Sequence, residues 1–500
     1  MIVRGRANFV AMISALSLCG ALAVNAQPLD GSWRSQGYGL YFDLSGQTLK
    51  AFEVTAMSCL PSFTAQRTAV ETNGDVVFKV VGRPTTFVFR SGGSPDRRQL
   101  HMNGAASDIV VRRGSAPAVC STPTPDTPLT NFDVFTRTWA EQYGFFDVRK
   151  ANWSAIVAKH RPRVTDRTTP GELFQILKEM IEPFEDAHTS IRADSINQAF
   201  SGTRRSANWL DHADRPRAFE IVEQRYMRAP LRSWCNGQVQ YGRLDGGVAY
   251  LRIKSFSGFG AQPGFERGLT ALEEALDAIF AAASSWVGLV IDVRINGGGS
   301  DPYGLAIASR LTSTEYVAYA KQARSDPQNA SRWTDTQPSV VRPTTKPSFR
   351  GPVVELTGIL SVSAAETFTQ ALLKRTPHIV RIGEPTQGVF SDVLGRTLPN
   401  GWRFGLPNER FVTDGKSYDG PGIPPDVVVP VFPKSDRDAG RDGAVEKALE
   451  LLVGRTVRVE RERQAARERM PQNTRRPAII GTSIMPIMSS HARQLPRFSV

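Results

Sequence analysis

Ser363 stands where a short apolar run gives way to a helical pattern. Residues 353–360 are β-rich and apolar, and from Phe368 onward apolar residues recur at helical spacing. A side chain at a strand-to-helix turn is exposed at the end of a sheet, and the amide of Ala364 points outward from the helix N-terminus. A hydroxyl beside such an amide suits nucleophilic attack on an acyl group. Serine is also a favoured helix N-cap, so a purely structural role is an open alternative.

A glycine-rich loop follows a second buried strand. The apolar run 287–294 leads into Asn-Gly-Gly-Gly at 296–299. Glycine is needed where the chain turns sharply and a substrate approaches the backbone closely. The amide of Gly298 or Gly299 could therefore bind an oxyanion together with Ala364. The loop lacks the Lys-Ser/Thr of a P-loop, and a plain tight turn is the alternative.

His188 is a candidate for proton transfer, although a lone histidine is more often structural. It follows a predicted helix that begins with Thr169 as N-cap and ends at Pro183, and Asp186 precedes it by two residues. An imidazole with a pKa near 6.5 can take a proton from a serine hydroxyl. Asp419 lies in a Gly/Pro-rich loop, where aspartate is usually a turn residue. Each signal is weak alone, and their combination carries the chemistry.

The elements that must position these residues fall into several segments. We predict a small antiparallel β domain at 29–120, a Pro/Thr-rich linker at 121–128 and a helical subdomain at 129–200. Strands alternate with helices between 246 and 430, which predicts an α/β core, placed at 201–435. The remainder, 436–500, is predicted to be a basic C-terminal extension that is partly disordered.

The first residues indicate export. Arg4 and Arg6 precede the apolar run 9–24, and small residues end at Ala26, so residues 1–26 are predicted to be a signal peptide. The run is short for a membrane span, and no other stretch is long enough. We therefore expect a periplasmic or secreted protein without a transmembrane segment.

The cysteines fit an oxidising compartment. Cys59, Cys120 and Cys235 remain after cleavage, which suggests one disulfide and one buried thiol. Cys59 and Cys120 are the favoured pair because they bracket a single β-rich segment. No Cys/His cluster has metal-ligand spacing, so neither a metal nor a cofactor is expected.

The net charge of +13 is unevenly distributed. Ten arginines and three glutamates lie between residues 451 and 500, so +7 of the charge belongs to this tail. The rest of the chain is only mildly basic, and export argues further against nucleic acid as a partner. A polyanion-binding role of the tail is the weakest of the hypotheses.

Five motifs in order resemble the family of tail-specific (C-terminal processing) and tricorn-type serine peptidases. They lie between about 132 and 431: Asp-Ala-His-Thr at 186–189, Val-Ala-Tyr-Leu-Arg-Ile at 248–253, Ile-Asp-Val-Arg-Ile-Asn-Gly-Gly-Gly at 291–299, Ser-Ala-Ala-Glu at 363–366, and Gly-Glu-Pro-Thr-Gln-Gly at 383–388 with Gly-Ile-Pro-Pro-Asp at 422–426. The resemblance implies a ClpP/crotonase-like α/β peptidase core with a helical N-terminal subdomain, here preceded by a small all-β domain.

The resemblance also implies the roles of the site residues. Tail-specific members use a Ser–Lys dyad, but Val389 occupies the lysine position here. The tricorn-like branch, without a PDZ domain, implies Ser363 as nucleophile, His188 as base and Asp419 as orienting acid, with Asp392 and Asp186 as rivals. Gly299, or else Gly298, would form the oxyanion hole with Ala364.

We thus expect an exported serine endopeptidase that cleaves a peptide or protein substrate through a Ser-His-Asp triad and an acyl-enzyme. A non-catalytic ligand- or peptide-binding protein on the same fold is the alternative. The sequence does not determine the oligomeric state.

Overall fold

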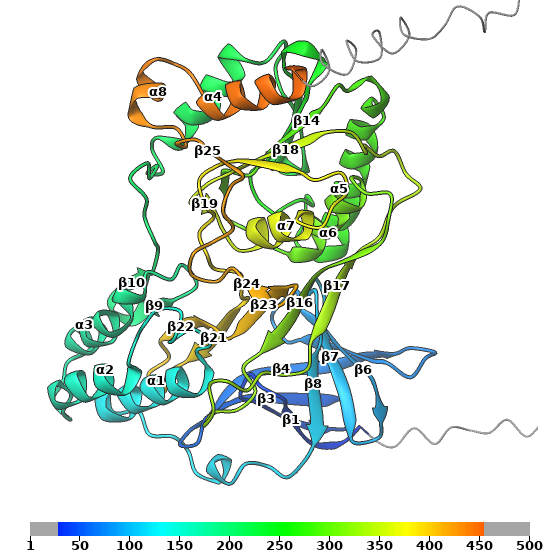
Figure 1. Cartoon of the computed structure of the whole chain (residues 1–500). Coiled ribbons are helices and arrows are strands. Elements are labelled where there is room, and N and C mark those ends of the chain that lie inside the picture. Colours follow the sequence, from blue (N-terminus) through cyan, green and yellow to red (C-terminus); the bar gives the residue numbers. More distant parts are fainter. Residues whose placement is uncertain (1–28, 455–500) are drawn as a thin grey trace, which may run out of the picture. The chain divides into compact units, whose positions relative to one another are not determined.

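The structure, a computed structural model, describes residues 29–454 and begins with a closed antiparallel barrel (Figure 1). Side chains alternate along its strands between the interior and the surface: in β3, Leu49 and Ala51 are buried and Lys50 is exposed. Large apolar residues such as Trp33 and Phe78 fill the interior. The strands are β1 Gly31–Ser35, β2 Leu40–Ser45, β3 Thr48–Val54, β4 Cys59–Val70, β5 Val76–Val80, β6 Thr86–Ser94, β7 Arg97–Met102 and β8 Ile109–Arg113.

A disulfide joins the barrel to the segment that follows it. Cys59, the first residue of β4, is bonded to Cys120 in a short 3-10 turn, Ala118–Ser121. The predicted pairing is confirmed, and Cys235 is a buried thiol.

A group of helices comes next in the chain. These are α1 Pro128–Gln142, α2 Trp153–His160 and α3 Pro170–Ile181. The predicted start of α3 is confirmed, because Thr169 and Glu172 form a reciprocal capping box around its first turn. Aromatic side chains dominate the core of this group, with Trp139 at its centre.

The α/β part is built on a seven-stranded sheet of order β11-β12-β13-β14-β18-β20-β25. The strands from β13 to β25 run parallel, as crossover connections require, and β11 and β12 are antiparallel at one edge. Their bounds are β11 Arg232–Trp234, β12 Val239–Arg243, β13 Ala249–Ile253, β14 Leu289–Asp292, β18 Val353–Thr357, β20 Val380–Gly383 and β25 Val427–Val428. The predicted α/β fold is confirmed.

Helices cover both faces of this sheet. One face packs against α5 (Phe265–Phe280), α6 (Asp301–Ser309) and α7 (Ala364–Leu372). The other packs against α4 (Arg215–Arg225) and against a helical stretch at 443–454. A short helix, α8 (Lys434–Asp438), lies just before that stretch.

Two smaller sheets connect distant parts of the chain. Strands β9 (Ser190–Ala193) and β10 (Gln198–Ser201) pair with β22 (Arg403–Pro407) and β21 (Val393–Thr397). A second sheet has the order β17-β16-β23-β24, formed by Gln337–Val341, Tyr316–Ala323, Glu409–Thr413 and Lys416–Ser417. Gln337 exchanges hydrogen bonds of 2.8 and 2.6 Å with the backbone of Asp108 in the barrel.

These pairings differ from the sequence-based segment boundaries. The core predicted at 201–435 is not one continuous unit, because Leu398, Trp402, Phe404 and Leu406 pack among the helices α1 and α3. The extension predicted from 436 also starts too early, since residues from 444 to 452 pack against the sheet. The predicted signal peptide and most of the predicted tail lie outside the described residues.

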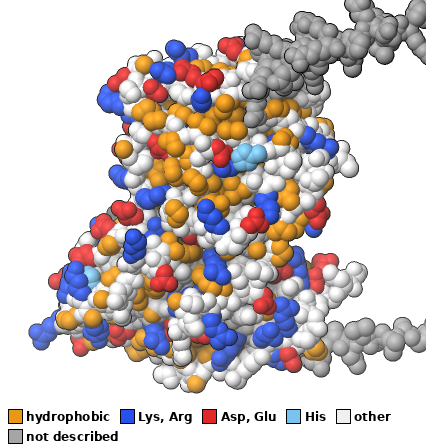
Figure 2. All heavy atoms as spheres, viewed as in Figure 1, with side chains coloured by type: hydrophobic (Ala, Val, Ile, Leu, Met, Phe, Trp, Pro, Cys, Tyr) orange, Lys and Arg blue, Asp and Glu red, His pale blue; other side chains and the backbone are white. Residues whose placement is uncertain are grey.

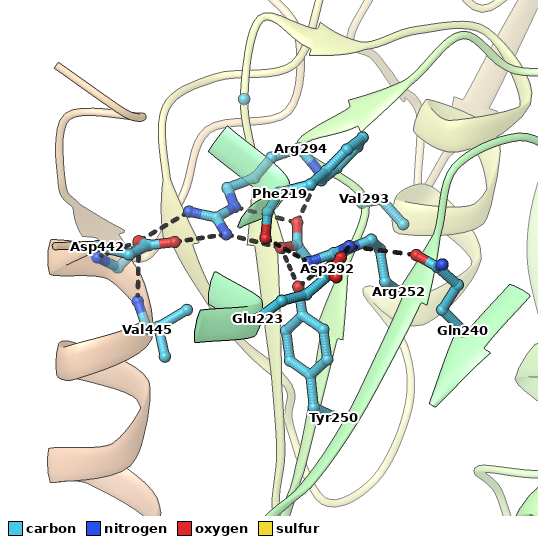
Figure 3. Close-up of polar contacts among 12 residues, drawn as sticks. Phe219, Glu223, Gln240, Tyr250, Arg252, Asp292, Val293, Arg294, Asp442 and Val445 are labelled. Carbon is cyan, nitrogen blue, oxygen red and sulfur yellow. Dashed lines mark hydrogen bonds and ion pairs between the residues drawn. The ribbon is translucent and has the colours of Figure 1, made fainter. Parts of the chain in front are cut away.

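A buried ion-pair network fixes the helical stretch 443–454 to the sheet (Figure 3). The Arg294 guanidinium contacts Asp292 at 2.6 Å and Asp442 at 2.8 Å. Asp442 also accepts hydrogen bonds from the amides of Ala444 and Val445, so it caps the helix that it anchors. Asp292 and Arg294, which belong to a motif of the sequence resemblance, thus hold the fold together.

Charged side chains of both signs are interspersed on the face shown in Figure 2. On that face no extended patch carries charge of a single sign. The excess positive charge that the sequence places between residues 451 and 500 therefore has no counterpart on that face. Within residues 29–454, no helix is long and apolar enough to cross a membrane.

Candidate functional site

Ser363 has a backbone conformation that is rare for a serine. It lies between β19 (Leu360–Ser361) and α7, with φ 59° and ψ −120°. Positive φ is uncommon outside glycine, and residues held in such conformations cluster at functional sites. The turn directs the chain sharply from strand to helix and leaves Ser363 half-buried at the end of the strand, a position that suits a nucleophile.

A buried carboxylate stabilises this turn. Glu366 Oε2 accepts hydrogen bonds from the amides of Ser363 (3.1 Å) and Val389 (2.9 Å), and Oε1 accepts one from Gly388 (2.6 Å). Burial raises the pKa of Glu366 to about 7, although the amide donors oppose that rise. The sequence signal for this role was available, since a Glu three residues after an N-cap serine is the capping-box pattern.

The glycine loop lies directly against Ser363. Strand β15 (Ile295–Asn296) pairs in parallel with β19, so the two turns that follow are neighbours. A Cβ on Gly298 would lie only 2.7 Å from Ser363 Cβ, and Gly298 has φ +86°. Only glycine satisfies both the close approach and the left-handed backbone here. The Asn296 side chain fixes the loop by bonding Ile253 O and the Gly298 amide, each at 2.9 Å.

The loop amides differ in whether they can receive an oxyanion. The Gly298 N–H already donates to Asn296 Oδ1. The amides of Gly299 and Ala364 donate to no acceptor within residues 29–454. Phe256 N donates to Gly298 O and Ser300 N donates to Phe256 O, so the Gly299 N–H between them faces away from Phe256. Of the two glycine amides considered from the sequence, that of Gly299 is the available one.

His188 is buried and lacks a partner on one ring nitrogen. Its backbone N–H donates to Asp186 Oδ1 at 3.0 Å, while Nδ1 is buried without a hydrogen bond. Burial lowers the pKa of His188, and nearby Asp186 and Asp392 only partly offset this. The imidazole is therefore neutral at neutral pH, the state that a general base needs.

Asp186 is held by two partners other than the imidazole. Tyr143 OH donates to Asp186 Oδ2 at 3.0 Å, and Arg149 pairs with the same oxygen at 3.3 Å. Arg149 also contacts Gly388 O at 3.5 Å, so this cluster lies beside the loop that binds Glu366.

Asp419 accepts hydrogen bonds from Ser417 Oγ at 2.6 Å and from Phe390 N at 3.3 Å. Burial raises its pKa to about 7, and the charges of Glu366 and Asp186 add to the rise. At neutral pH a sizeable share of Asp419 is thus protonated, which weakens it as an orienting anion.

Asp392 is the second carboxylate, after Asp186, whose charge acts on the imidazole. Lys321 Nζ lies 2.6 Å from Asp392 Oδ2 and 3.1 Å from Glu409. Partial desolvation works to raise the pKa of Asp392, whose side chain is 52% exposed, but Lys321 outweighs this effect and holds the pKa below its ordinary value. Asp392 is therefore ionised at neutral pH. Lys321 was not found from the sequence, because its neighbours Asp392 and Glu409 come from segments about 70 to 90 residues away.

The structure thus brings together Ser363, Ala364, Gly298 and Gly299. No hydrogen bond in the described part of the chain joins His188 to Ser363 or to Asp419. Catalytic hydrogen bonds are often long in enzymes without substrate and shorten when it binds. The same part of the chain contains no group of His, Cys, Asp and Glu that could hold a metal ion.

Two family models match this chain. Residues 247–429 match peptidase family S41, and residues 125–182 match the tricorn protease C1 domain. The first covers the parallel strands β13, β14, β18, β20 and β25 of the sheet, the glycine loop, the Ser363 turn and Asp419. The second covers the helical group that leads to His188.

Several solved structures are similar to this chain. A candidate peptidase from Parabacteroides merdae is 27% identical, with a TM-score of 0.55 over 66% of this chain and 98% of that chain. Mature CPAF complexed with lactacystin is 13% identical (TM-score 0.48), covering 65% of this chain and 97% of that chain. The tricorn protease is 15% identical (TM-score 0.41), covering 83% and 45%.

Proposed function

We propose that this chain, which belongs to peptidase family S41, hydrolyses peptide bonds through an acyl-enzyme formed on Ser363. The family match supports a serine-type peptidase whose substrate is a peptide or protein. The observation that carries the finer assignment is the strained turn at Ser363, which lies beside two backbone amides without acceptors.

The proposed reaction uses groups already in the site. Ser363 Oγ attacks the scissile carbonyl carbon while the His188 imidazole takes the hydroxyl proton. The C–N bond then breaks as the imidazolium returns that proton to the leaving amine. Water, deprotonated by the same imidazole, cleaves the acyl–Oγ bond and regenerates the serine.

The amides of Gly299 and Ala364 are the proposed oxyanion hole. Each is an unused donor next to Ser363, so neither has to break a hydrogen bond when negative charge develops on the carbonyl oxygen. One such donor typically contributes about 3 kcal/mol to the transition state.

Asp419 is the proposed acid that orients His188, as the sequence resemblance implies. It belongs to the same buried cluster, since Asp186 acts electrostatically on both Asp419 and His188. Asp419 can accept a hydrogen bond from the unpartnered Nδ1 of His188 only if its carboxylate gives up the hydrogen bond from Ser417 Oγ.

Active-site labelling with a fluorophosphonate tests the nucleophile and the base. We expect wild type to be labelled, Ser363→Ala to be unlabelled, and His188→Ala to be slowed by orders of magnitude. Ser154→Ala, an exposed serine on α2, is the matched control and should label like wild type. Equal labelling of Ser363→Ala and wild type would refute the assignment. A wild type that is folded but inert would favour the non-catalytic alternative.

Three isosteric variants identify the acid. Asp419→Asn should lower turnover by about 10⁴-fold if this carboxylate holds the tautomer of His188. Asp392→Asn and Asp186→Asn are compared in the same assay, with thermal melting to detect misfolding. Unchanged turnover in Asp419→Asn would move the role to whichever of the other two fails.

Export is part of the proposal and rests on residues 1–26 and on the disulfide. A stable disulfide between Cys59 and Cys120 fits an oxidising compartment. Expression of the whole chain in a bacterial host should place it outside the cytoplasm with Gln27 as its first residue. An intact N-terminus in the cytoplasmic fraction would contradict this.

A further inference from the structure

An apolar cavity of about 320 Å³ lies at one mouth of the barrel. Met102 and Val393 at its rim stay 42% and 49% exposed, and large exposed apolar side chains often mark binding surfaces. Barrel mouths are a common place for ligand pockets of this size. The apolar lining consists of Leu40, Phe42, Phe63, Val80, Phe87, Leu100, Met102, Ile109, Val393 and Leu394.

Charged residues of the peptidase part form the opposite wall of this cavity. Lys321 is buried between Asp392 and Glu409, and Tyr38 OH of the barrel donates to Glu409 Oε1 at 2.6 Å. The Asp392 side chain remains 52% exposed, so this wall offers the cavity one accessible carboxylate. The cavity is thus built jointly by barrel and peptidase residues.

One short chain segment joins the cavity to Ser363. The Val389 amide binds the Glu366 carboxylate that also holds the Ser363 amide. Asp392, three residues later, lines the cavity. Three residues span at most about 11 Å, so the cavity lies close to the nucleophile turn.

A second connection runs through the glycine loop. Ser300 Oγ, next to Gly299, donates to Gly104 O of the barrel at 2.7 Å. Gly104 and Gly299 line an open groove of about 660 Å³, whereas Ala105, the next residue, lines the cavity. The barrel loop at 103–105 therefore borders both the cavity and the groove that Gly299 lines.

We propose that the barrel-mouth cavity is a substrate subsite, which takes a bulky apolar side chain of the peptide within about five residues of the scissile bond. This inference rests on the proposed function. The range follows from the chain path: at most about 11 Å from Val389 to Asp392, plus hydrogen bonds of 2.9 and 3.1 Å through Glu366 to the Ser363 amide, a span that about five residues of extended peptide can cover at about 3.3 Å each. The two short connections to the catalytic turns favour a substrate side chain over a free apolar molecule.

Cavity-filling variants test the subsite. Ala105→Trp and Ser107→Trp place an indole in the cavity, and Ala106→Trp is the matched control because Ala106 does not line it. Labelling with the fluorophosphonate should be the same in all four proteins, since none of these residues belongs to the catalytic set. Cleavage of a diverse peptide library, read by mass spectrometry, then gives the preference at each position around the scissile bond.

We expect wild type and Ala106→Trp to select large apolar residues at one fixed position within that range. A synthetic peptide carrying that residue should be cleaved with a kcat/KM about 10- to 100-fold above its alanine counterpart, as expected for burying one large apolar side chain. In Ala105→Trp and Ser107→Trp this ratio should fall to within about threefold.

Four results would overturn the subsite. Cleavage without a positional apolar preference, or a preference that survives both filling variants, refutes it while leaving the peptidase assignment intact. Loss of anilinonaphthalene sulfonate binding in the filled variants without any change in cleavage would instead assign the cavity to a free apolar ligand. Absence of labelling and cleavage in wild type would refute the peptidase function and the subsite together.

Discussion

Glu366 determines whether Ser363 can hold its rare backbone conformation. Its two carboxylate oxygens accept three backbone N–H groups, one from Ser363 and two from the loop at 388–389. The loop at 388–389 leads to Asp392, which lines the cavity. The Glu366 carboxylate therefore fixes the position of the Ser363 turn relative to that wall of the cavity. A single buried residue thereby couples the chemistry to the proposed subsite.

Replacing Glu366 by glutamine should slow fluorophosphonate labelling by about 10- to 100-fold. The amide nitrogen cannot accept, so at least one buried N–H loses its partner at a cost of about 1–3 kcal/mol, and the turn relaxes. Labelling rates and thermal melts are compared with Glu220→Gln, an exposed glutamate on α4. Unchanged labelling in a stable Glu366→Gln protein would show that the turn does not need this carboxylate.

The pH dependence of labelling reports on His188. Burial lowers its pKa, so the imidazole stays in the basic, neutral form down to below its usual value near 6.5. The titration of His188 should therefore lower the labelling rate only below pH 6.5. A midpoint near 7 would instead assign the fall to Asp419, whose pKa is raised to about 7.

At the scale of elements, the Arg294 network anchors the helical stretch 443–454 (Figure 3). Asp442 does two things: it neutralises Arg294 and it caps the helix through Ala444 and Val445. Asp292 supplies the second carboxylate and also accepts a hydrogen bond from Tyr250. Arg294 is fully enclosed, so loss of either partner leaves guanidinium N–H groups without an acceptor in the interior.

Asp442→Asn and Asp442→Ala should separate these two contributions. Asparagine keeps the cap but removes the charge, and we expect a loss of about 3 kcal/mol of unfolding free energy. Alanine also removes the cap and should cost about 1 kcal/mol more. Urea unfolding measures both, and equal stability of the two variants would contradict the capping role.

At the scale of the whole described chain, the barrel contributes residues to the proposed substrate-binding region. It is joined to the peptidase by hydrogen bonds from Tyr38 to Glu409, between Asp108 and Gln337, and from Ser300 to Gly104. Two of these contacts flank the cavity and the groove. An accessory β domain of unassigned role in the sequence is thus a structural partner of the site.

Buried carboxyls should also make the whole protein more stable at mildly acidic pH. Burial raises the pKa of Asp301, Glu355, Glu366 and Asp419 to about 7. The folded state then binds more protons than the unfolded state between about pH 4 and 7. The stability that these four carboxyl groups add to the folded state is fully present below their ordinary pKa values. It is lost as the pH rises to 7. His188 opposes this trend, because its lowered pKa costs stability as it becomes protonated below pH 6.5.

Urea unfolding at pH 5 and pH 7 measures this effect, and we expect the higher unfolding free energy at pH 5. Glu355→Gln is the informative variant, since one of its carboxylate oxygens is buried without a hydrogen bond. The variant should show a smaller difference between the two pH values. A higher stability of wild type at pH 7 would contradict the prediction.

The sequence by itself determined the features encoded by neighbouring residues. The turn at Ser363, the capped start of α3 and the glycine loop follow from local backbone preferences, because capping, helix periodicity and turn geometry act over a few residues. The α/β fold follows from the alternation of such segments. The disulfide between Cys59 and Cys120 was also within reach, since the two cysteines bracket one β-rich segment.

Only the tertiary structure decided which groups meet. The occupied amide of Gly298, the Lys321–Asp392 pair and the contact of Asp419 with Ser417 depend on the pairing of loops and strands. So do the packing of residues 398–406 among the helices and the anchoring of Asp442 by Arg294. A difference of a few tenths of an ångström decides whether a hydrogen bond forms. Those distances depend on strand register, and no local sequence pattern specifies that register.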